Sequence, residues 1–209
     1  MQLMSKNFSN AEKIPGNLAF AVPAKEDHIK LSANRNPELH WNEVPAGTKS
    51  LALICADPDV PSQPDDVNQE GRSVPKDLPR VTFYHWVMID IPAGLTHIEE
   101  GSCSDGVTER GKKNPPGPQG SRQGINDYTG WFSGDPDMAG DYYGYDGPCP
   151  PWNDELLHRY EFTLYALDIE RCPVNERFSA QEVLQAIEGH ILDKATLTGV
   201  YTLNPAVSI

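Results

Sequence analysis

Residues 145–168 read YDGPCPPWNDELLHRYEFTLYALD, and they join a stiff turn directly to an alternating strand. The turn contains Gly147, Pro148, Pro150 and Pro151. Proline fixes φ and lacks an N–H group, and glycine allows close backbone approach, so this turn is ordered before any ligand binds. In an extended chain, side chains two residues apart share a face, and here one face carries His158, Tyr160, Phe162, Leu164 and Ala166. We therefore predict that His158 and Tyr160 lie on the apolar face of this strand.

A second stretch, TFYHWVMIDI at residues 82–91, shows a similar alternation. Its odd-numbered residues, which we predict to share one apolar face, are Phe83, His85, Val87, Ile89 and Ile91. A lone histidine on such a face is more often a core residue with a hydrogen-bond partner than a ligand or a proton carrier. Two histidines on the apolar faces of two different strands favour a shared functional site that contains His85 and His158.

Residues 50–57, SLALICAD, are apolar on both faces and predict a central strand that is covered on both sides. The strand runs into DPDVP at residues 57–61, where the two prolines are expected to end the pairing. This would leave Asp57 and Asp59 displayed at the end of a rigid strand. Asp57 is the stronger site candidate, because Asp59 is as well suited to capping backbone groups in a turn.

Many short strands and one late helix predict an all-β fold, mainly β, in which two sheets pack together. The helix is expected over residues 178–189, where Ser179 and Glu182 have the spacing of a capping box. A short strand over residues 198–203 is expected to close the chain.

The length fits one domain, residues 1–209, with a long glycine- and aromatic-rich excursion at about residues 92–145. The aromatic residues in or next to this excursion are Tyr128, Trp131, Phe132, Tyr142, Tyr143 and Tyr145. We expect them to anchor the excursion on the body of the protein. A pocket wall and a dimer contact are the alternatives.

The composition excludes several classes of function. A formal charge of −13 is unsuited to nucleic acid and to anionic membrane surfaces, since both need a basic footprint. No apolar run approaches the ~20 residues of a membrane span, and the N-terminus lacks the pattern of a secretory signal, so we expect a cytoplasmic protein without integral membrane association. The four cysteines show no CxxC spacing, which favours free thiols over disulfides or a structural zinc site.

Three separated motifs together resemble one known family. They are DPDVP at residues 57–61, YHW at residues 84–86, and GPCPP at residues 147–151 followed by HRYEFTLYALD at residues 158–168. In this order they are similar to the phosphatidylethanolamine-binding protein family, in particular its bacterial branch described as Raf-kinase-inhibitor-like. The resemblance covers most of the chain from about Asn34 onward.

The resemblance implies a Greek-key β-sandwich with a small pocket at one end that accepts the phosphate groups of lipids or nucleotides. It also implies a kinase or protease partner whose activity the protein inhibits or modulates. The implied ligand-binding residues are Asp57, His85, Gly147, Pro148, His158 and Tyr160. Asp59 and Arg159 are expected to contact these ligand-binding residues without touching the ligand.

We therefore interpret the chain as a small-anion binding module, with no cofactor or metal and no catalytic residues. Protonated imidazoles, the Tyr160 hydroxyl and backbone N–H groups near Gly147 can each donate to an anion. Asp57 would orient one imidazole and favour its charged form, so binding should strengthen toward acid pH. The chief alternative is a metal-dependent or acid/base hydrolase that uses His85, His158 and Asp57. A third alternative is a protein that acts through its surface, as an inhibitor or a homodimer.

Overall fold

The computed structural model describes residues 1–209, and its main element is a five-stranded antiparallel sheet with the order β10-β9-β5-β6-β8. Its strands are β5 (Ser50–Pro61), β6 (Arg80–Pro92), β8 (Arg122–Gln123), β9 (His158–Leu167) and β10 (Ile191–Tyr201). Within the sheet, β9 returns by a long connection to lie beside β5, which gives the order β9-β5-β6-β8 of a Greek key.

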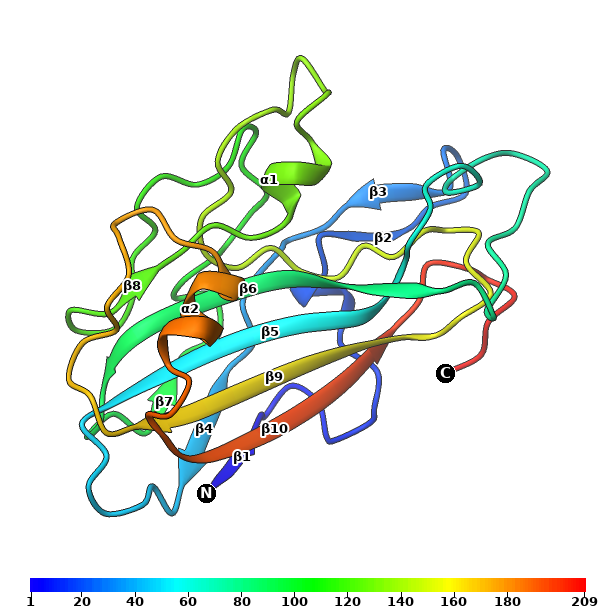
Figure 1. Ribbon diagram of the computed structural model, residues 1–209. Coiled ribbons are helices and arrows are strands. Elements are labelled where there is room, and N and C mark those ends of the chain that lie inside the picture. Colours follow the sequence, from blue (N-terminus) through cyan, green and yellow to red (C-terminus); the bar gives the residue numbers. More distant parts are fainter.

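Two smaller sheets and three short helices complete the chain (Figure 1). One sheet has the order β1-β4-β7, and the other is the β2–β3 hairpin. Their strands are β1 (Gln2–Met4), β2 (Ala21–Pro23), β3 (Ile29–Leu31), β4 (Leu39–Asn42) and β7 (His97–Ile98). The helices are η1 (Gly16–Leu18), α1 (Tyr128–Trp131) and α2 (Ala180–Ala186). The mainly β fold that the sequence predicts is confirmed.

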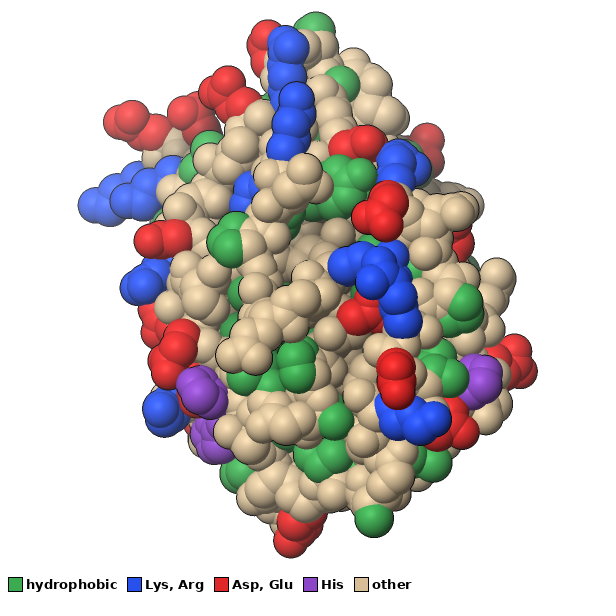
Figure 2. Space-filling view, turned by 90° about the vertical axis from the view of Figure 1, so that its left-hand side faces the viewer, with side chains coloured by type: hydrophobic (Ala, Val, Ile, Leu, Met, Phe, Trp, Pro, Cys, Tyr) green, Lys and Arg blue, Asp and Glu red, His purple; other side chains and the backbone are tan.

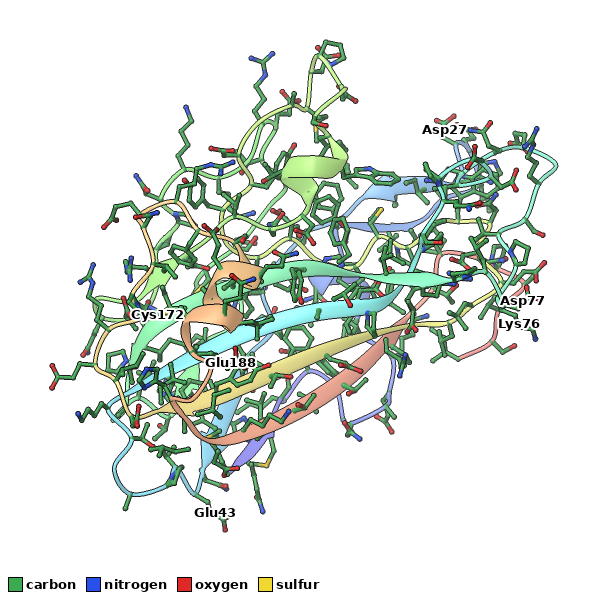
Figure 3. The ribbon with its side chains drawn as sticks, viewed as in Figure 1. Asp27, Glu43, Lys76, Asp77, Cys172 and Glu188 are labelled. Atoms are coloured by element: carbon green, nitrogen blue, oxygen red, sulfur yellow. The ribbon has the colours of Figure 1, made fainter.

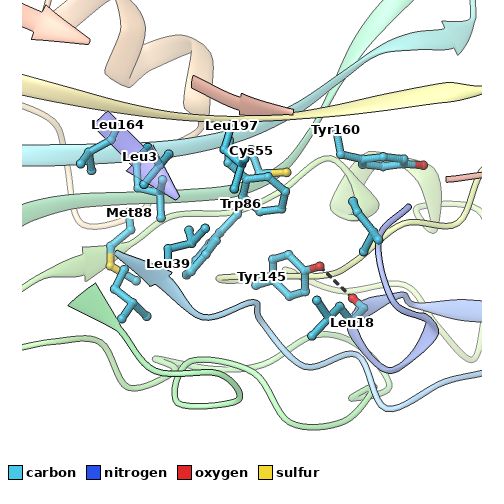
Figure 4. Packing of buried hydrophobic residues seen from close by; sticks show 14 of the residues in the cluster. Leu3, Leu18, Leu39, Cys55, Trp86, Met88, Tyr145, Tyr160, Leu164 and Leu197 are labelled. Carbon is cyan, nitrogen blue, oxygen red and sulfur yellow. Dashed lines mark hydrogen bonds between the residues drawn. The ribbon is translucent and has the colours of Figure 1, made fainter. Parts of the chain in front are cut away.

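The main core lies between the large sheet and the β1-β4-β7 sheet. It joins side chains of the small sheet, such as Leu39 and Trp41, to side chains of the large sheet, such as Leu53 and Phe162. The alternation predicted for β9 is confirmed, because His158, Tyr160, Phe162, Leu164 and Ala166 are all fully buried. Figure 4 shows this packing, with Tyr160 and Tyr145 on the same side of the sheet.

The alternation predicted for β6 is wrong for Val87 and Ile89, whereas Ile91 lies in the main core as predicted, after a second register shift between Met88 and Ile91. Trp86 pairs with Cys55 and Tyr84 pairs with Ala56, so His85 is an extra residue that forms a β-bulge. The bulge places the consecutive residues His85 and Trp86 on the core side of the sheet. Val87 and Ile89 consequently face the opposite side, where they pack in a second cluster with α2.

The prolines of DPDVP do not end β5, which corrects a second expectation. Pairing with β6 continues through Val60 and Pro61, and a register shift between Asp57 and Val60 accommodates the extra residue. A bulge is one of the few places where a strand tolerates proline. The strand therefore carries Asp57 inside the sheet instead of at its free end.

The outer face of the large sheet is covered by α2, as Figure 1 shows, and by the segment that contains Cys172, which is labelled with Glu188 in Figure 3. The predicted capping box is confirmed, since the Ser179 hydroxyl accepts from the Glu182 N–H and the Glu182 carboxylate accepts from the Ser179 N–H. The final strand β10 is longer than predicted. None of the helices has the length and apolar character needed to cross a bilayer.

The long excursion is anchored by its aromatic residues, as predicted. Tyr128, Tyr142 and Tyr145 are buried, and the Tyr145 hydroxyl donates to the Leu18 carbonyl oxygen at 2.8 Å (Figure 4). The excursion also supplies β8, which pairs with β6 at the edge of the large sheet. Trp131 differs from the buried group because 52% of its surface is exposed.

Candidate functional site

A cavity of about 390 Å³ lies where the large sheet meets α1, the β2–β3 hairpin and residues 149–151. Four of its polar lining residues come from the three central strands: Asp57 from β5, His85 from β6, and His158 and Tyr160 from β9. Most of the other lining residues are hydrophobic, and no lysine or arginine reaches the cavity. The structure thus brings these four sequence candidates to one place, although they are far apart in the chain.

His158 is held between two carboxylates. Its Nδ1 lies 2.7 Å from Asp57 Oδ2, and its Nε2 lies 3.0 Å from Asp154 Oδ2. Burial alone would lower the pKa of His158, but the charge of Asp57 and the hydrogen bonds to Asp154 and Asp57 outweigh it and raise this pKa to about 9. His158 is therefore an imidazolium at neutral pH, and neither of its nitrogens is free for a ligand.

Two arginines balance the carboxylates around this imidazolium. Arg80 donates to the Asp154 carboxylate through both terminal nitrogens, with Nη2 3.1 Å from Oδ1. Arg159 donates to the Asp59 carboxylate, with Nε 2.9 Å from Oδ2 and Nη2 2.8 Å from Oδ1. Burial raises the pKa of both carboxyl groups, but these arginine contacts together with His158 hold it below its usual value. The network contains three carboxylates, two guanidiniums and one imidazolium, so its net charge is zero.

His85 is bound on one side only. Its Nδ1 lies 2.8 Å from the Asp146 carbonyl oxygen, and because a carbonyl can only accept, Nδ1 carries the proton. Burial lowers the pKa of His85, and the nearby charge of Asp57 opposes this only in part. His85 is therefore neutral near pH 7, and its Nε2, which makes no hydrogen bond within the protein, presents a lone pair.

The Tyr160 hydroxyl is the second polar group without a partner. The side chain is fully buried, and its oxygen has no hydrogen bond. The oxygens of the neighbouring Asp57 accept from His158 and from the Asp59 N–H. Asp57 also lies close enough to the Tyr160 hydroxyl to act on its pKa as a weak acceptor, but the two groups do not meet in hydrogen-bond geometry. Burial, followed by the charge of Asp57, raises the pKa of Tyr160 well above its usual value, so the hydroxyl keeps its proton and remains a donor.

Asp146 fixes the orientation of His85 from outside the cavity. Its buried carboxylate accepts from Asn34 Nδ2 at 2.7 Å, from Lys112 Nζ at 2.8 Å and from Asn126 Nδ2 at 2.8 Å. Its N–H donates to the His85 carbonyl oxygen at 3.1 Å, while its own carbonyl accepts from the imidazole. The long excursion is thereby joined to β6 at the residue where the bulge occurs.

Gly147 and Pro148 lie behind the cavity and are not among its lining residues. The Gly147 N–H donates to Asn34 Oδ1 at 2.8 Å, and the Pro148 carbonyl oxygen accepts from the Phe20 N–H at 3.0 Å. A Cβ at Gly147 would lie only 2.1 Å from the Leu18 carbonyl oxygen, so glycine is required for this close approach. The turn reaches the cavity through its last three residues, 149–151.

Comparison with known proteins identifies the family. The family model described as phosphatidylethanolamine-binding protein matches residues 4–202. The chain belongs to this family. The resemblance seen in three sequence motifs is therefore confirmed over nearly the whole chain.

Relatives of this chain include archaeal and bacterial proteins. A UPF0098 protein of Methanothermobacter thermautotrophicus is 39% identical over 168 residues, which cover 80% of this chain and 83% of the relative. The UPF0098 protein YbhB of Escherichia coli is 30% identical over 202 residues, which cover 97% of this chain and 100% of YbhB.

Among solved structures, Escherichia coli YbcL, described as a new member of the mammalian family, has a TM-score of 0.67 at 27% identity. The alignment covers 96% of this chain and 97% of YbcL. The homologue CT736 of Chlamydia trachomatis has a TM-score of 0.64 at 26% identity, with 96% and 95% covered. Both support the same fold over nearly the whole chain.

Sequence reasoning missed three residues of the site in this family member. Asp154 and Arg80 complete the network around His158, and the backbone of Asp146 orients His85. A sequence signal existed for Asp154, which lies four residues before His158 and follows a proline turn. Arg80 and Asp146 had none, because their contacts depend on strand register and on the path of the excursion.

No group of three or more His, Cys, Asp or Glu side chains is arranged to hold a metal ion. His158 already has both nitrogens bonded to carboxylates, and His85 has one nitrogen bonded to a carbonyl. Metal binding by both histidines would require at least one of the His158 bonds to break. All four cysteines are free thiols, and burial raises the pKa of the cavity residue Cys149 to about 12.

Proposed function

We propose that the protein binds a small ligand through a phosphate group at the polar end of this cavity. The observation that carries the proposal is the fully buried Tyr160 hydroxyl, which has no partner and lines the cavity together with His85. An unpaired buried polar group costs about 1–3 kcal/mol, so a ligand oxygen that accepts from Tyr160 gains this amount in addition to its own hydrogen bond.

The two free groups define the protonation state of the bound ligand. Tyr160 donates, and neutral His85 accepts at Nε2, so a phosphate group that keeps one P–OH proton satisfies both. Whether the proton stays on the phosphate or moves to Nε2, the complex holds one proton more than the neutral imidazole and a phosphate dianion. Because the second pKa of a phosphate monoester is ≈ 6, binding is expected to strengthen as the pH falls toward 6.

Calorimetric titration with inorganic phosphate at pH 6 and pH 8 tests this proposal. Tyr160→Phe and His85→Gln should each weaken binding by roughly tenfold to a hundredfold, the range for a lost hydrogen bond to a charged group. Tyr165→Phe is the matched control, since Tyr165 lies on the same strand but packs on the α2 side of the sheet. Equal affinity in all four proteins, or no binding by the wild type at millimolar concentration, would refute the site.

The same titrations separate binding from the hydrolase alternative. We expect no turnover of p-nitrophenyl phosphate above the rate without enzyme. Catalytic release of p-nitrophenol that is lost in His85→Gln would replace the binding proposal with a hydrolytic one.

Regulation of a kinase or protease partner stays a prediction, supported by the family resemblance. The sharpest test compares the proteins captured from cell extract by the wild type and by Tyr160→Phe, with and without phosphate. Partners that depend on both the ligand and Tyr160 would link regulation to the cavity. The homodimer and the cytoplasmic location also stay predictions, which sedimentation velocity and cell fractionation would test.

A further inference from the structure

The aromatic residues beside the polar end of the cavity form a continuous wall. The Phe83 ring centroid lies 4.8 Å from that of His85 and 5.1 Å from that of Tyr128. Tyr128 in turn stacks on Phe20 at 4.7 Å and on Phe132 at 5.7 Å. All five rings line the cavity. Because the rings already pack on one another, the wall is formed before a ligand arrives.

The mouth of the cavity is also apolar. Trp131 and Leu31 line it, yet they are 52% and 60% exposed to solvent. The α1 segment that carries Trp131 lies close to the β2–β3 hairpin that carries Leu31 (Figure 1). An apolar path therefore leads from the polar end to solvent.

The charged side chains of the cavity limit how many charged groups the ligand can carry. Lysine and arginine are absent from the lining, although both are plentiful elsewhere on the surface, where Figure 2 shows them interspersed with acidic residues. Asp57 and the His158 imidazolium balance one another. A ligand with several phosphates would therefore meet no cation other than the His158 imidazolium, which Asp57 and Asp154 already neutralise, while a single monoprotonated group meets the donor and the acceptor described above.

The size of the cavity exceeds what a free phosphate fills. Its volume of about 390 Å³ is the bulk-liquid share of roughly thirteen water molecules. From these observations, which rest on the phosphate-binding function proposed above, we infer that the ligand is a compact aromatic phosphate monoester whose ring packs against the wall of Phe20, Phe83, Tyr128 and Phe132. The phosphate group of this ligand contacts Tyr160 and His85, and the ligand carries no second charged group.

A ligand series tests this inference on the intact protein. Calorimetry at pH 6 would compare inorganic phosphate, glycerol 3-phosphate, phenyl phosphate and phenol. Burying a phenyl ring should make phenyl phosphate roughly tenfold to a hundredfold tighter than inorganic phosphate and glycerol 3-phosphate. Phenol should bind more weakly than phenyl phosphate by at least tenfold, because it leaves the polar end unpaired.

Two variants test the wall itself. Phe83→Leu keeps an apolar side chain but removes a ring, and Trp131→Ser changes an exposed residue at the mouth, where folding is least affected. Each should reduce the preference for phenyl phosphate over inorganic phosphate by threefold or more while leaving the affinity for inorganic phosphate unchanged. Val81→Ser is the control, because Val81 is an exposed residue of β6 outside the cavity.

The outcomes separate the inference from the function on which it rests. If inorganic phosphate binds and phenyl phosphate is no tighter, the aromatic ligand class is refuted and the phosphate site stands. If no phosphate compound binds at millimolar concentration, both fail. Cosedimentation with phosphatidic acid vesicles that is lost in Tyr160→Phe, at concentrations where phenyl phosphate shows no binding, would also overturn the compact ligand, since a lipid would then be the occupant of the cavity.

Discussion

Asp57→Asn is the substitution that most clearly separates a charged His158 from a neutral one. The pKa of His158 in the folded protein is about 9, compared with about 6.5 for an unperturbed histidine. The folded protein therefore binds more protons than the unfolded chain between these values, and its stability falls as the pH rises through this window. At about 1.36 kcal/mol per pKa unit, the charged His158 contributes about 3 kcal/mol below pH 6.5, and this contribution is lost by about pH 9.

In Asp57→Asn, the amide oxygen can still accept from the Asp59 N–H, and the amide N–H can donate to Nδ1 of a neutral His158. The substitution therefore removes the Asp57 charge, the largest of the influences that raise the pKa of His158, without leaving either hydrogen bond unmade, while Asp154 stays in place and keeps part of the shift. Because Asp154 still supports a charged His158, urea unfolding of the two proteins should show a stability difference of about 1–3 kcal/mol at pH 6, which becomes clearly smaller at pH 9.5.

The matched control is Asp168→Asn, which removes the carboxylate that lies 2.8 Å from Nδ1 of His190 on the surface. Such exposed pairs contribute about 0–1 kcal/mol, so little change is expected. A stability difference that is the same at pH 6 and pH 9.5 in Asp57→Asn would refute the reasoning. An NMR titration that places the pKa of His158 near 6.5 would do so as well.

Three further predictions concern single groups. Tyr160→Phe should leave the free energy of unfolding unchanged or raise it, because it removes an unpaired buried hydroxyl. A loss of more than about 1 kcal/mol in urea unfolding would show that the hydroxyl is hydrogen-bonded in the free protein. Gly147→Ala should lower the free energy of unfolding by about 1–3 kcal/mol or more, since its Cβ would lie 2.1 Å from the Leu18 carbonyl oxygen. In the same thermal unfolding assay, the control Gly134→Ala should lower it by less than about 0.5 kcal/mol, because nothing lies within 4 Å of its Cβ. Ser179→Ala should lower stability by about 1 kcal/mol through loss of the helix cap, and no change in the urea midpoint would contradict the capping box.

The sequence was sufficient for the elements whose pattern is local. The alternation of β9 placed His158 and Tyr160 on the buried face, and the spacing of Ser179 and Glu182 predicted the cap of α2. These features depend only on neighbours two to four residues away. The family could also be inferred, because its motifs are short and contiguous.

Features that depend on register could not be predicted. The bulge at His85 reverses the facing of β6, so the correct prediction that His85 points inward came from an alternation that fails two residues later. The continuation of β5 through Pro61 has the same origin, since a bulge removes the need for regular pairing. The bulge at His85 has no signal in the sequence of β6, and Pro58 in β5 is compatible both with a bulge and with the end of a strand.

The protonation of the site is a second limit of sequence reasoning. The sequence suggests two imidazoles that both donate to an anion, one of them oriented by Asp57, whereas the structure leaves only one imidazole free for a ligand. His158 is enclosed by Asp57 and Asp154, and His85 keeps a free Nε2. This division depends on Asp154 and Asp146, whose positions follow from the turn and the long excursion.

The most direct test of the account is an NMR spectrum of the imidazole nitrogens, recorded near pH 7 with and without phenyl phosphate. The free protein should show His85 protonated only at Nδ1 and His158 protonated at both nitrogens. Addition of the ligand should shift the Nε2 signal of His85 toward that of a protonated or hydrogen-bonded nitrogen, while both His158 signals remain in place. An unchanged His85 signal at millimolar ligand, or a ligand-dependent change confined to His158, would contradict a phosphate site built on His85 and Tyr160.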